Sequence, residues 1–412
     1  MKDFYNMDKK IINNTINTNR FNESITFKDG KKKKIKFDII LLFLILAISG
    51  FGVLIIYSAT RYSLPGGVSD PKYYLIRQGY WLIISVIVFF LLQFINYRIL
   101  KKYWWIVLII NILALASVFI FGHEIRGTGR WINLKLFSIQ PSEFSKILMI
   151  IVVSVILSKW QREKINKVGF KKVLLSLLVV LICMILVVIE PDYGTALIFF
   201  LVYVAILFLS GANFLYILAI LILTAVGLFL AFKIGLIKQY QLDRILVFLK
   251  PNVQQEGIGF NLFQSKRAIG SGRLWGTGLF LGKQTNLNYV PEQHTDFIFS
   301  VIGEELGFFG AVVVIVIFAL IIWSCFYISS NTKDSFGSLI AGGIGFLLLT
   351  QVMINIGMTI GIMPVIGIPL PFLSYGGSNL LSIFIGMGLV ENIYLKRDLR
   401  KEYEIAYEDF GR

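Results

Sequence analysis

Long runs of apolar residues alternate with shorter polar segments over most of the chain. Ten such runs lie at about 38–58, 79–95, 103–122, 142–158, 173–190, 194–210, 213–232, 303–329, 337–360 and 374–394. Each is close to the roughly 20 apolar residues that a helix needs to cross a bilayer. Glycine and proline interrupt several runs, which membrane-spanning helices tolerate. The pattern predicts an all-α integral membrane protein with about ten transmembrane helices.

Composition supports a membrane protein. Hydrophobic residues make up 56% of the 412 residues and charged residues only 16%, against about 25% charged residues in soluble domains. Cys183 and Cys325 lie in apolar runs, so they indicate neither a disulfide framework nor a metal site. The first 37 residues are polar, and the first apolar run is too long for the core of a cleavable signal peptide.

The polar segments divide the chain into a basic tail at 1–37, a ten-helix membrane domain at 38–394 and a C-terminal tail at 395–412. Within the domain, residues 233–302 are too long for a connector between helices 7 and 8. Their apolar and aromatic content favours a folded extracytoplasmic loop with one or two short helices over disorder.

Orientation in the membrane explains most of the net charge of +16. With both termini in the cytoplasm, 25 basic residues lie inside and 14 outside. Only 6 remain outside without the long loop, which counts little in the positive-inside rule. The charge therefore does not require a nucleic-acid partner, and we expect the N-terminal tail to touch anionic lipid.

Two motifs lie at the outer ends of predicted helices. GTGRWIN at 127–133 precedes QPSEFSK at 140–146, in which Glu143 and Lys146 are three residues apart and share a helix face. An interfacial ion pair is one interpretation, but charges that enter a span by default mark a substrate path. For EPDYGT at 190–195 a structural role as a tight turn is favoured.

The long loop contains a glycine-rich stretch at 270–278, followed by Gly282-Lys283. It is not a P-loop, because Gly278 and Gly282 have three residues between them instead of four and Gln284 replaces Ser or Thr. A backbone nest for an anionic headgroup and ordinary turn glycines both remain open.

PEQHTDFIF at 291–299 ends the loop and leads into GEELG at 303–307. Asp296 precedes Phe-Ile-Phe, so partly apolar surroundings should raise its pKa and make it a better base. An interfacial Asp that caps the eighth helix is the alternative. The His294 and Asp296 spacing matches no zinc pattern. Because His123 is the other histidine, no Ser-His-Asp order can be assigned.

Three prolines between residues 364 and 371 predict a rigid, non-helical connector before the last helix. At membrane depth such backbone is tolerated only where it is buried in protein or lines a cavity. Broken segments of this kind often build substrate sites in membrane proteins.

Five stretches together resemble the SEDS family of bacterial cell-wall synthesis, which includes RodA, FtsW and SpoVE. They are GTGRWINL with QPSEFSK, EPDYGTAL, GFNLFQSKRAIGSG, YVPEQHTDFIFSVIGEELGFFG, and NIGMTIGIMPVIGIPLPFLSYGGSN. They follow the family's order between about residues 127 and 378. Residues 282–284 and IGIPLPFLSYGGS are more similar to RodA than to FtsW. Arg273 stands where the family usually has glycine, and Phe260-Asn261 where Tyr-Gln is usual.

The resemblance implies a peptidoglycan glycosyltransferase that polymerises lipid II on the outer face of the inner, cytoplasmic membrane, for cell elongation and rod shape. The transfer would invert the sugar carbon and release undecaprenyl diphosphate. The implied partners are lipid II, the nascent glycan strand, a class B penicillin-binding protein and other membrane proteins of the elongation complex. The alternatives are a lipid II flippase, a noncatalytic scaffold, and a division- or sporulation-specific polymerase of the FtsW or SpoVE type.

Asp296 matches the family's essential aspartate and would act as base toward the 4-hydroxyl of the acceptor sugar. Diphosphate is already a good leaving group, so a second, acidic carboxyl is unnecessary. The growing charge on diphosphate instead needs cations, first of all Arg130 and Lys146. No cofactor is obligatory, although Mg or Mn could share this work, and no metal ligands are assigned. The expected substrate-binding residues are Arg130, Glu143, Lys146, Arg244, Lys266, Arg273, His294, Glu304, Ser374 and Tyr375.

Overall fold

The computed structural model describes residues 37–62, 70–125, 128–133, 137–158, 168–235, 239–249 and 257–396. The predicted N-terminal tail, except its last residue, and the predicted C-terminal tail, except its first two residues, lie outside the described residues. The chain from Phe37 onward forms one compact unit, and the described part of this unit is mostly helical.

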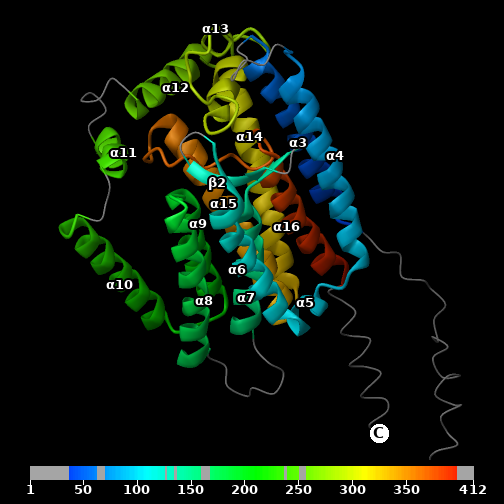
Figure 1. Cartoon of the computed structure of the whole chain (residues 1–412). Helices are drawn as coiled ribbons and strands as arrows, with labels where there is room; N and C mark the ends of the chain where they lie inside the picture. Colours follow the sequence, from blue (N-terminus) through cyan, green and yellow to red (C-terminus); the bar gives the residue numbers. More distant parts are fainter. Residues whose placement is uncertain are drawn as a thin grey trace, which may run out of the picture. The chain divides into compact units, whose positions relative to one another are not determined.

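Long helices occupy all ten positions that the apolar runs predicted (Figure 1). Within the described residues, eight are long and apolar enough to cross a membrane, and two more have 17 residues each. Seventeen residues span about 25 Å at 1.5 Å per residue, close to a hydrocarbon core of about 30 Å. The predicted multi-pass membrane protein is therefore confirmed. The eight are α3 (Ile39–Thr60), α4 (Tyr73–Phe94), α6 (Trp104–Phe121), α8 (Phe170–Ile189), α10 (Phe214–Lys233), α14 (Ile298–Asn331), α15 (Ser335–Ile360) and α16 (Gly377–Lys396), and the shorter two are α7 (Pro141–Leu157) and α9 (Tyr193–Leu209).

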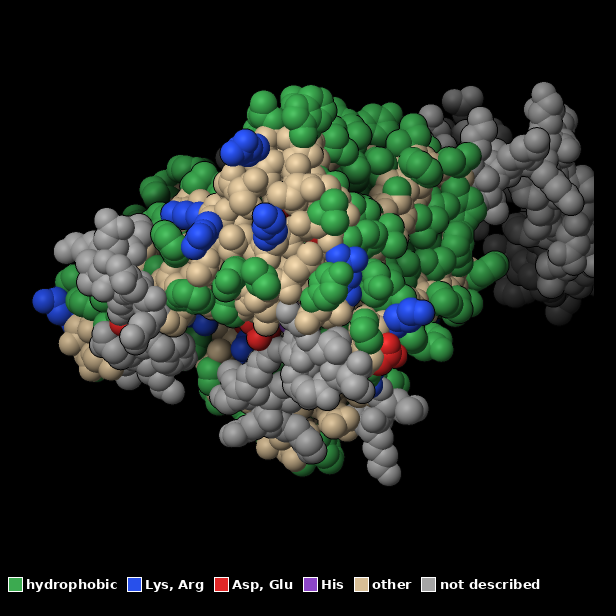
Figure 2. Space-filling model, turned by 90° about the horizontal axis from the view of Figure 1, so that it is seen from above, with side chains coloured by type: hydrophobic (Ala, Val, Ile, Leu, Met, Phe, Trp, Pro, Cys, Tyr) green, Lys and Arg blue, Asp and Glu red, His purple; other side chains and the backbone are tan. Residues whose placement is uncertain are grey.

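The helices differ in how much of their surface is covered by protein. Most residues of α15 and α16 are buried, whereas only 11% of the apolar window of α10 is. A helix that is apolar on all sides belongs in a core or in lipid, so the apolar side chains on the outer faces of α4, α6 and α10 fit a lipid contact. Figure 2 looks onto one end of the molecule and shows apolar side chains over the flank, with basic side chains scattered across that end.

A small antiparallel sheet, which the sequence analysis missed, follows α6. It contains β1 (Gly122–Ile125), β2 (Thr128–Asn133) and β3 (Ser138–Ile139) in the order β1-β2-β3. Ile132 in the central strand lies opposite Ile139 of the third. These strands are short, so the alternation of apolar and polar residues that marks a strand is hard to recognise between the long apolar runs on either side. The sheet matters for the site because its central strand carries Arg130.

The predicted loop at 233–302 is folded and contains three helical segments, one more than the upper expectation. They are α11 (Gln239–Leu249), α12 (Ile258–Gly272) and α13 (Lys283–Asn286), of which the last is a single turn. They lie together at one end of the long helices (Figure 1). The five-residue α5 (Arg98–Lys102) joins α4 to α6.

A second, smaller core joins this loop to the long helices. It includes Val247 of α11, Leu262 of α12, Phe297 before α14 and Met358 of α15. The first turns of α14 precede a kink at Gly307, whose φ of 65° is outside the helical region. The loop is thereby packed onto the same backbone that leads from Asp296 into α14.

Candidate active site

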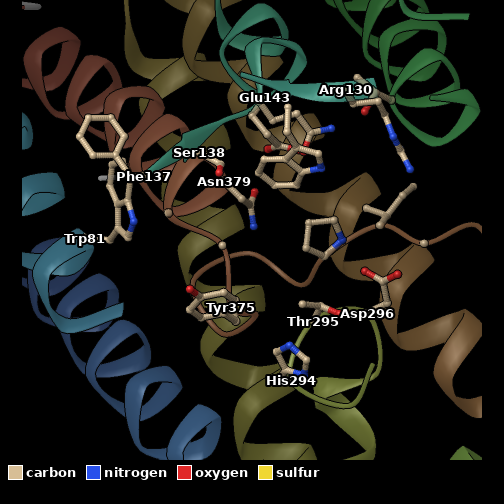
Figure 3. Close-up of a pocket in the computed structure, with 18 of the residues that line it drawn as sticks. Trp81, Arg130, Phe137, Ser138, Glu143, His294, Thr295, Asp296, Tyr375 and Asn379 are labelled. Atoms are coloured by element: carbon tan, nitrogen blue, oxygen red, sulfur yellow. The ribbon is translucent and has the colours of Figure 1, made fainter. Parts of the chain in front are cut away.

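A cavity of about 560 Å³ lies where α4, β2, β3 and the starts of α7 and α9 meet the segment before α14. Its remaining wall comes from the first residues of α16 and from residues 361–376, the non-helical connector between α15 and α16, which we call the strap. Figure 3 shows side chains from these elements around the cavity, with Arg130 and Asp296 on different walls. Six of the eleven predicted site residues line it: Arg130, Glu143, Lys146, His294, Asp296 and Tyr375.

Glu143 and Lys146 form an ion pair in the lining of the cavity. Lys146 Nζ lies 2.7 Å from Glu143 Oε2, and their side chains are only 2% and 5% exposed. Pro141 at the first position of α7 suits the start of a helix, because its missing N–H would have no partner there. The prediction that the two charged residues share one helix face is confirmed by this geometry.

Asp192 joins several elements of the site. Its carboxylate accepts from the backbone N–H of Thr195 at 3.2 Å and so caps α9, as the interpretation of this motif as a turn predicts. The sequence did not reveal that Asp192 also lines the cavity and pairs with Arg130, with 3.2 Å between Nη1 and Oδ1. Gln140 Nε2 donates to the same carboxylate at 3.1 Å. Arg130 is thereby held at the cavity wall.

Glu190 lies beside this pair and is 4% exposed. Neither of its carboxyl oxygens has a hydrogen-bond partner among the described residues. Burial, together with the nearby negative charge of Asp192, raises the pKa of Glu190 to about 8, and the positive charge of Arg130 opposes the shift. Glu190 therefore favours the protonated, neutral form near neutral pH.

Asp296 lines the cavity on the segment that leads into α14. The strap passes directly against its carboxylate, because a Cβ added at Gly367 would lie 3.2 Å from Asp296 Oδ2. Gly367 has φ +81°, a conformation that favours glycine. On the other side, the amide of buried Gln293 donates to the carbonyls of Ala59 and Thr285 at 2.8 and 2.9 Å. The base candidate thus sits on a segment that is fixed from two directions.

The other half of the cavity is aromatic, and most of it was not predicted. Tyr74 of α4 contacts the rings of Tyr375 and His294, with centroids 4.9 and 5.2 Å apart. Trp81 packs on the strap end of α16, where a Cβ at Gly377 would collide with its indole ring.

Arg77 lies on the same face of α4 as Tyr74 and Trp81, at helical spacings of three and four. Its guanidinium hydrogen-bonds the side chain of Tyr375, whose pKa is raised by burial and lowered by this neighbour, with burial the larger effect. The predicted second span began at residue 79, so Tyr74 and Arg77 were placed in the preceding loop. Their spacing to Trp81 was the available signal that one helix face carries all three.

Two predicted site residues make backbone hydrogen bonds between the strap and its neighbours instead of lining the cavity. Arg244 Nη1 of α11 donates to the Ile366 carbonyl at 2.7 Å. Ser374 is 1% exposed, and its Oγ donates to the Thr295 carbonyl at 2.6 Å. Both therefore contact backbone next to the site.

Three further predicted site residues lie away from the cavity lining. Glu304 is fully buried and accepts from the backbone N–H groups of Gln284 and Thr285 at 2.7 and 2.9 Å. Lys266 is exposed on α12, and exposed Arg273 ends that helix. Arg273 has φ +50°, where a glycine would be unstrained. Contact of these residues with substrate stays a prediction.

Metal-binding residue types are not clustered in the part of the chain that the structure describes: it contains no group of three or more His, Cys, Asp or Glu side chains able to hold an ion.

Comparison with known proteins places this architecture among cell-wall enzymes. The FtsW/RodA/SpoVE family model, described as a cell cycle protein, matches residues 39–399. The probable peptidoglycan glycosyltransferase FtsW of Wigglesworthia glossinidia brevipalpis is 38% identical over 93% of this chain and 98% of that protein. The peptidoglycan glycosyltransferase MrdB of Escherichia coli K12 is 33% identical over 89% of this chain and 95% of its own length.

A solved chain from a study of polymerization and crosslinking by a peptidoglycan synthase complex has the same fold. It superposes with a TM-score of 0.73 and 28% identity, over 88% of this chain and 98% of that chain.

Proposed function

This chain belongs to the FtsW/RodA/SpoVE family, the SEDS family, and we propose that it is a peptidoglycan glycosyltransferase that polymerises lipid II from the cavity at Asp296. The observation that carries the proposal is the set of groups around one space. A carboxylate that can serve as base and three cationic side chains, Arg77, Arg130 and Lys146, line the same cavity.

The reaction needs a base and a site for a departing anion. Asp296 accepts the proton of the acceptor 4-hydroxyl while that oxygen attacks the anomeric carbon of the donor. The new C–O bond forms as the bond to the diphosphate oxygen breaks, so the anomeric carbon inverts and undecaprenyl diphosphate leaves. Arg130 and Lys146 stabilise the negative charge that develops on the leaving group.

Two of the cationic side chains that line the cavity already have carboxylate partners. Lys146 is already paired with Glu143, and Arg130 with Asp192. An incoming diphosphate must therefore share these cations with the two carboxylates. A divalent cation, Mg or Mn, would add positive charge without being obligatory, and activity in the presence of a chelator measures how much it contributes.

The membrane context follows from the same proposal. The chain lies in the inner membrane with both termini in the cytoplasm, which puts the loop helices α11 to α13 and the cavity on the outer side. A class B penicillin-binding protein crosslinks the product, in line with the synthase complex of the structural relative. The relatives include proteins named FtsW and MrdB. The RodA-like motifs favour the elongation complex, with nascent glycan as the product and no nucleic acid as partner.

The test uses the purified protein in complex with its cognate class B penicillin-binding protein and fluorescent lipid II. We expect glycan polymer from the wild type and none from Asp296→Asn, with the complex still assembled and its thermal midpoint unchanged. Polymer at the wild-type rate from this variant would refute the role of Asp296 as base. Movement of lipid II across a proteoliposome without polymer would favour a flippase, and polymer formation by the partner alone would favour a scaffold.

A further inference from the structure

The backbone that precedes α14 is tied to the strap through consecutive carbonyl groups. The His294 carbonyl accepts from the backbone N–H of Tyr375 at 2.8 Å. The next carbonyl, that of Thr295, accepts from Ser374 Oγ at 2.6 Å. Both bonds come from the end of the strap, so the segment with Asp296 and the strap are held as one layer.

The third carbonyl in this series, that of Asp296 itself, is held from α15. Asn355 Nδ2 donates to it at 2.8 Å and to the carbonyl of Ile368 in the strap at 2.7 Å. An amide nitrogen has two hydrogens, so these two bonds use both. Asn355 is 0% exposed, and a carbonyl released at such a buried position loses a bond that water cannot readily replace.

The two hydrogen bonds donated by Asn355 fix two backbone segments that meet at the carboxylate of Asp296. Ile368 directly follows Gly367, the residue against which Asp296 Oδ2 lies. If the Asp296 carbonyl and the Ile368 carbonyl lose their common donor, the carboxylate and the wall beside it can shift relative to each other. Asn355 does not itself line the cavity, so it has no direct way to bind substrate.

We propose that Asn355 is a positioning residue that sets the orientation of Asp296 by tying its carbonyl to that of Ile368. The inference rests on the proposed function, in which Asp296 is the general base. Misplacing a reacting group by about 1 Å can cost about 100-fold in rate. We therefore expect Asn355→Leu, which keeps the branched shape of the side chain and removes both donors, to lower kcat about 100-fold. The KM for lipid II should stay within about twofold, because Asn355→Leu replaces no side chain that lines the cavity.

The experiment measures kcat and KM on fluorescent lipid II with the intact complex. Thr359→Val is the matched control, because Thr359 lies one turn further along α15, is equally buried, and its hydroxyl donates to the Asn355 carbonyl within the helix. We expect the control to keep wild-type kcat and KM. A wild-type kcat for folded Asn355→Leu, or a raised KM at unchanged kcat, would overturn the inference.

A double variant separates positioning from a general structural role. In an Asp296→Asn background, adding Asn355→Leu should leave the affinity for lipid II unchanged, because the group that Asn355 positions is already gone. A further loss of lipid II affinity would instead show that Asn355 supports the whole cavity, and the inference would fail.

Two outcomes keep the inference distinct from the proposed function. If Asp296→Asn polymerises normally, the proposed base is wrong. If Asp296→Asn is inactive and Asn355→Leu is fully active, only the positioning role is wrong. Should Asn355→Leu not fold, Asn355→Ser, which offers at most one donor, is expected to give an intermediate kcat at unchanged KM, and wild-type kcat would contradict the inference.

Discussion

Removing one member of the Glu143–Lys146 pair should destabilise the protein more than removing both. The nitrogen and oxygen lie 2.7 Å apart, and both side chains are at least 95% buried. At an effective dielectric constant of about 20, their attraction is on the order of 6 kcal/mol. Taking two charges out of water costs several kcal/mol each, so the net value of the pair is small. A single charge left behind loses the attraction and keeps its own desolvation cost.

We expect Lys146→Met and Glu143→Gln each to cost about 3–5 kcal/mol of stability. The double variant should lie close to the wild type, because a buried ion pair replaced by neutral groups of similar size is often neutral for stability. The two residues are in contact, so their effects should be strongly non-additive.

The assay is thermal unfolding of the four proteins in the same detergent, followed by lipid II polymerisation. The double variant should regain the thermal midpoint without regaining activity, because Lys146 is also proposed to meet the diphosphate. Equal midpoints for Lys146→Met and the wild type would refute the reasoning from burial. Recovery of activity in the double variant would show that the pair serves the fold alone.

Three further predictions concern single residues. Glu190→Gln should flatten the dependence of stability on pH. Burial raises the pKa of Glu190 from the usual carboxyl value of 4.5 to about 8 in the folded protein, so wild-type stability falls as pH rises from about 4.5 through 8. Thermal midpoints at pH 5 and pH 9 check this, and an equal drop in both proteins would contradict it. Arg273→Gly should raise stability by about 1 kcal/mol, because φ +50° is strained for arginine; a lower midpoint than that of the wild type would count against strain there. Arg244→Ala should lower kcat several-fold with little change in the thermal midpoint, because the hydrogen bond from Arg244 to the Ile366 carbonyl holds the strap from outside the cavity. Arg244→Lys, which keeps a donor, should retain more activity. Wild-type activity of both variants would argue against this role of Arg244.

The apolar runs in the sequence were enough to place the long helices, because a helix that is apolar on all sides must be buried in protein or lie in lipid. It was also enough to pair Glu143 with Lys146, since that contact lies within one helix and depends on spacing alone. The sequence did not predict the small sheet, because β2 and its neighbours have too few residues for an alternating pattern to be recognised.

The site residues show the same difference between local motifs and contacts that depend on packing. Arg130, Lys146 and Asp296 could be selected from motifs in which charge meets apolar sequence. Ser374 was also selected, but as a substrate contact, whereas the structure gives its hydroxyl to the Thr295 carbonyl. Whether a polar side chain faces a cavity or a backbone carbonyl depends on which segment packs beside it, and local sequence does not record that.

The amino-acid pattern was sufficient to show that the chain crosses the membrane many times and to identify the motifs that carry carboxylates and cations. These properties depend on composition and on contacts a few residues apart. Tertiary structure alone decided that α4 supplies Arg77 and an aromatic wall, that Asp192 holds Arg130, and that Asn355 ties Asp296 to the strap. The physical reason is distance along the chain: such contacts join segments tens to hundreds of residues apart, and they form only when packing brings those segments together.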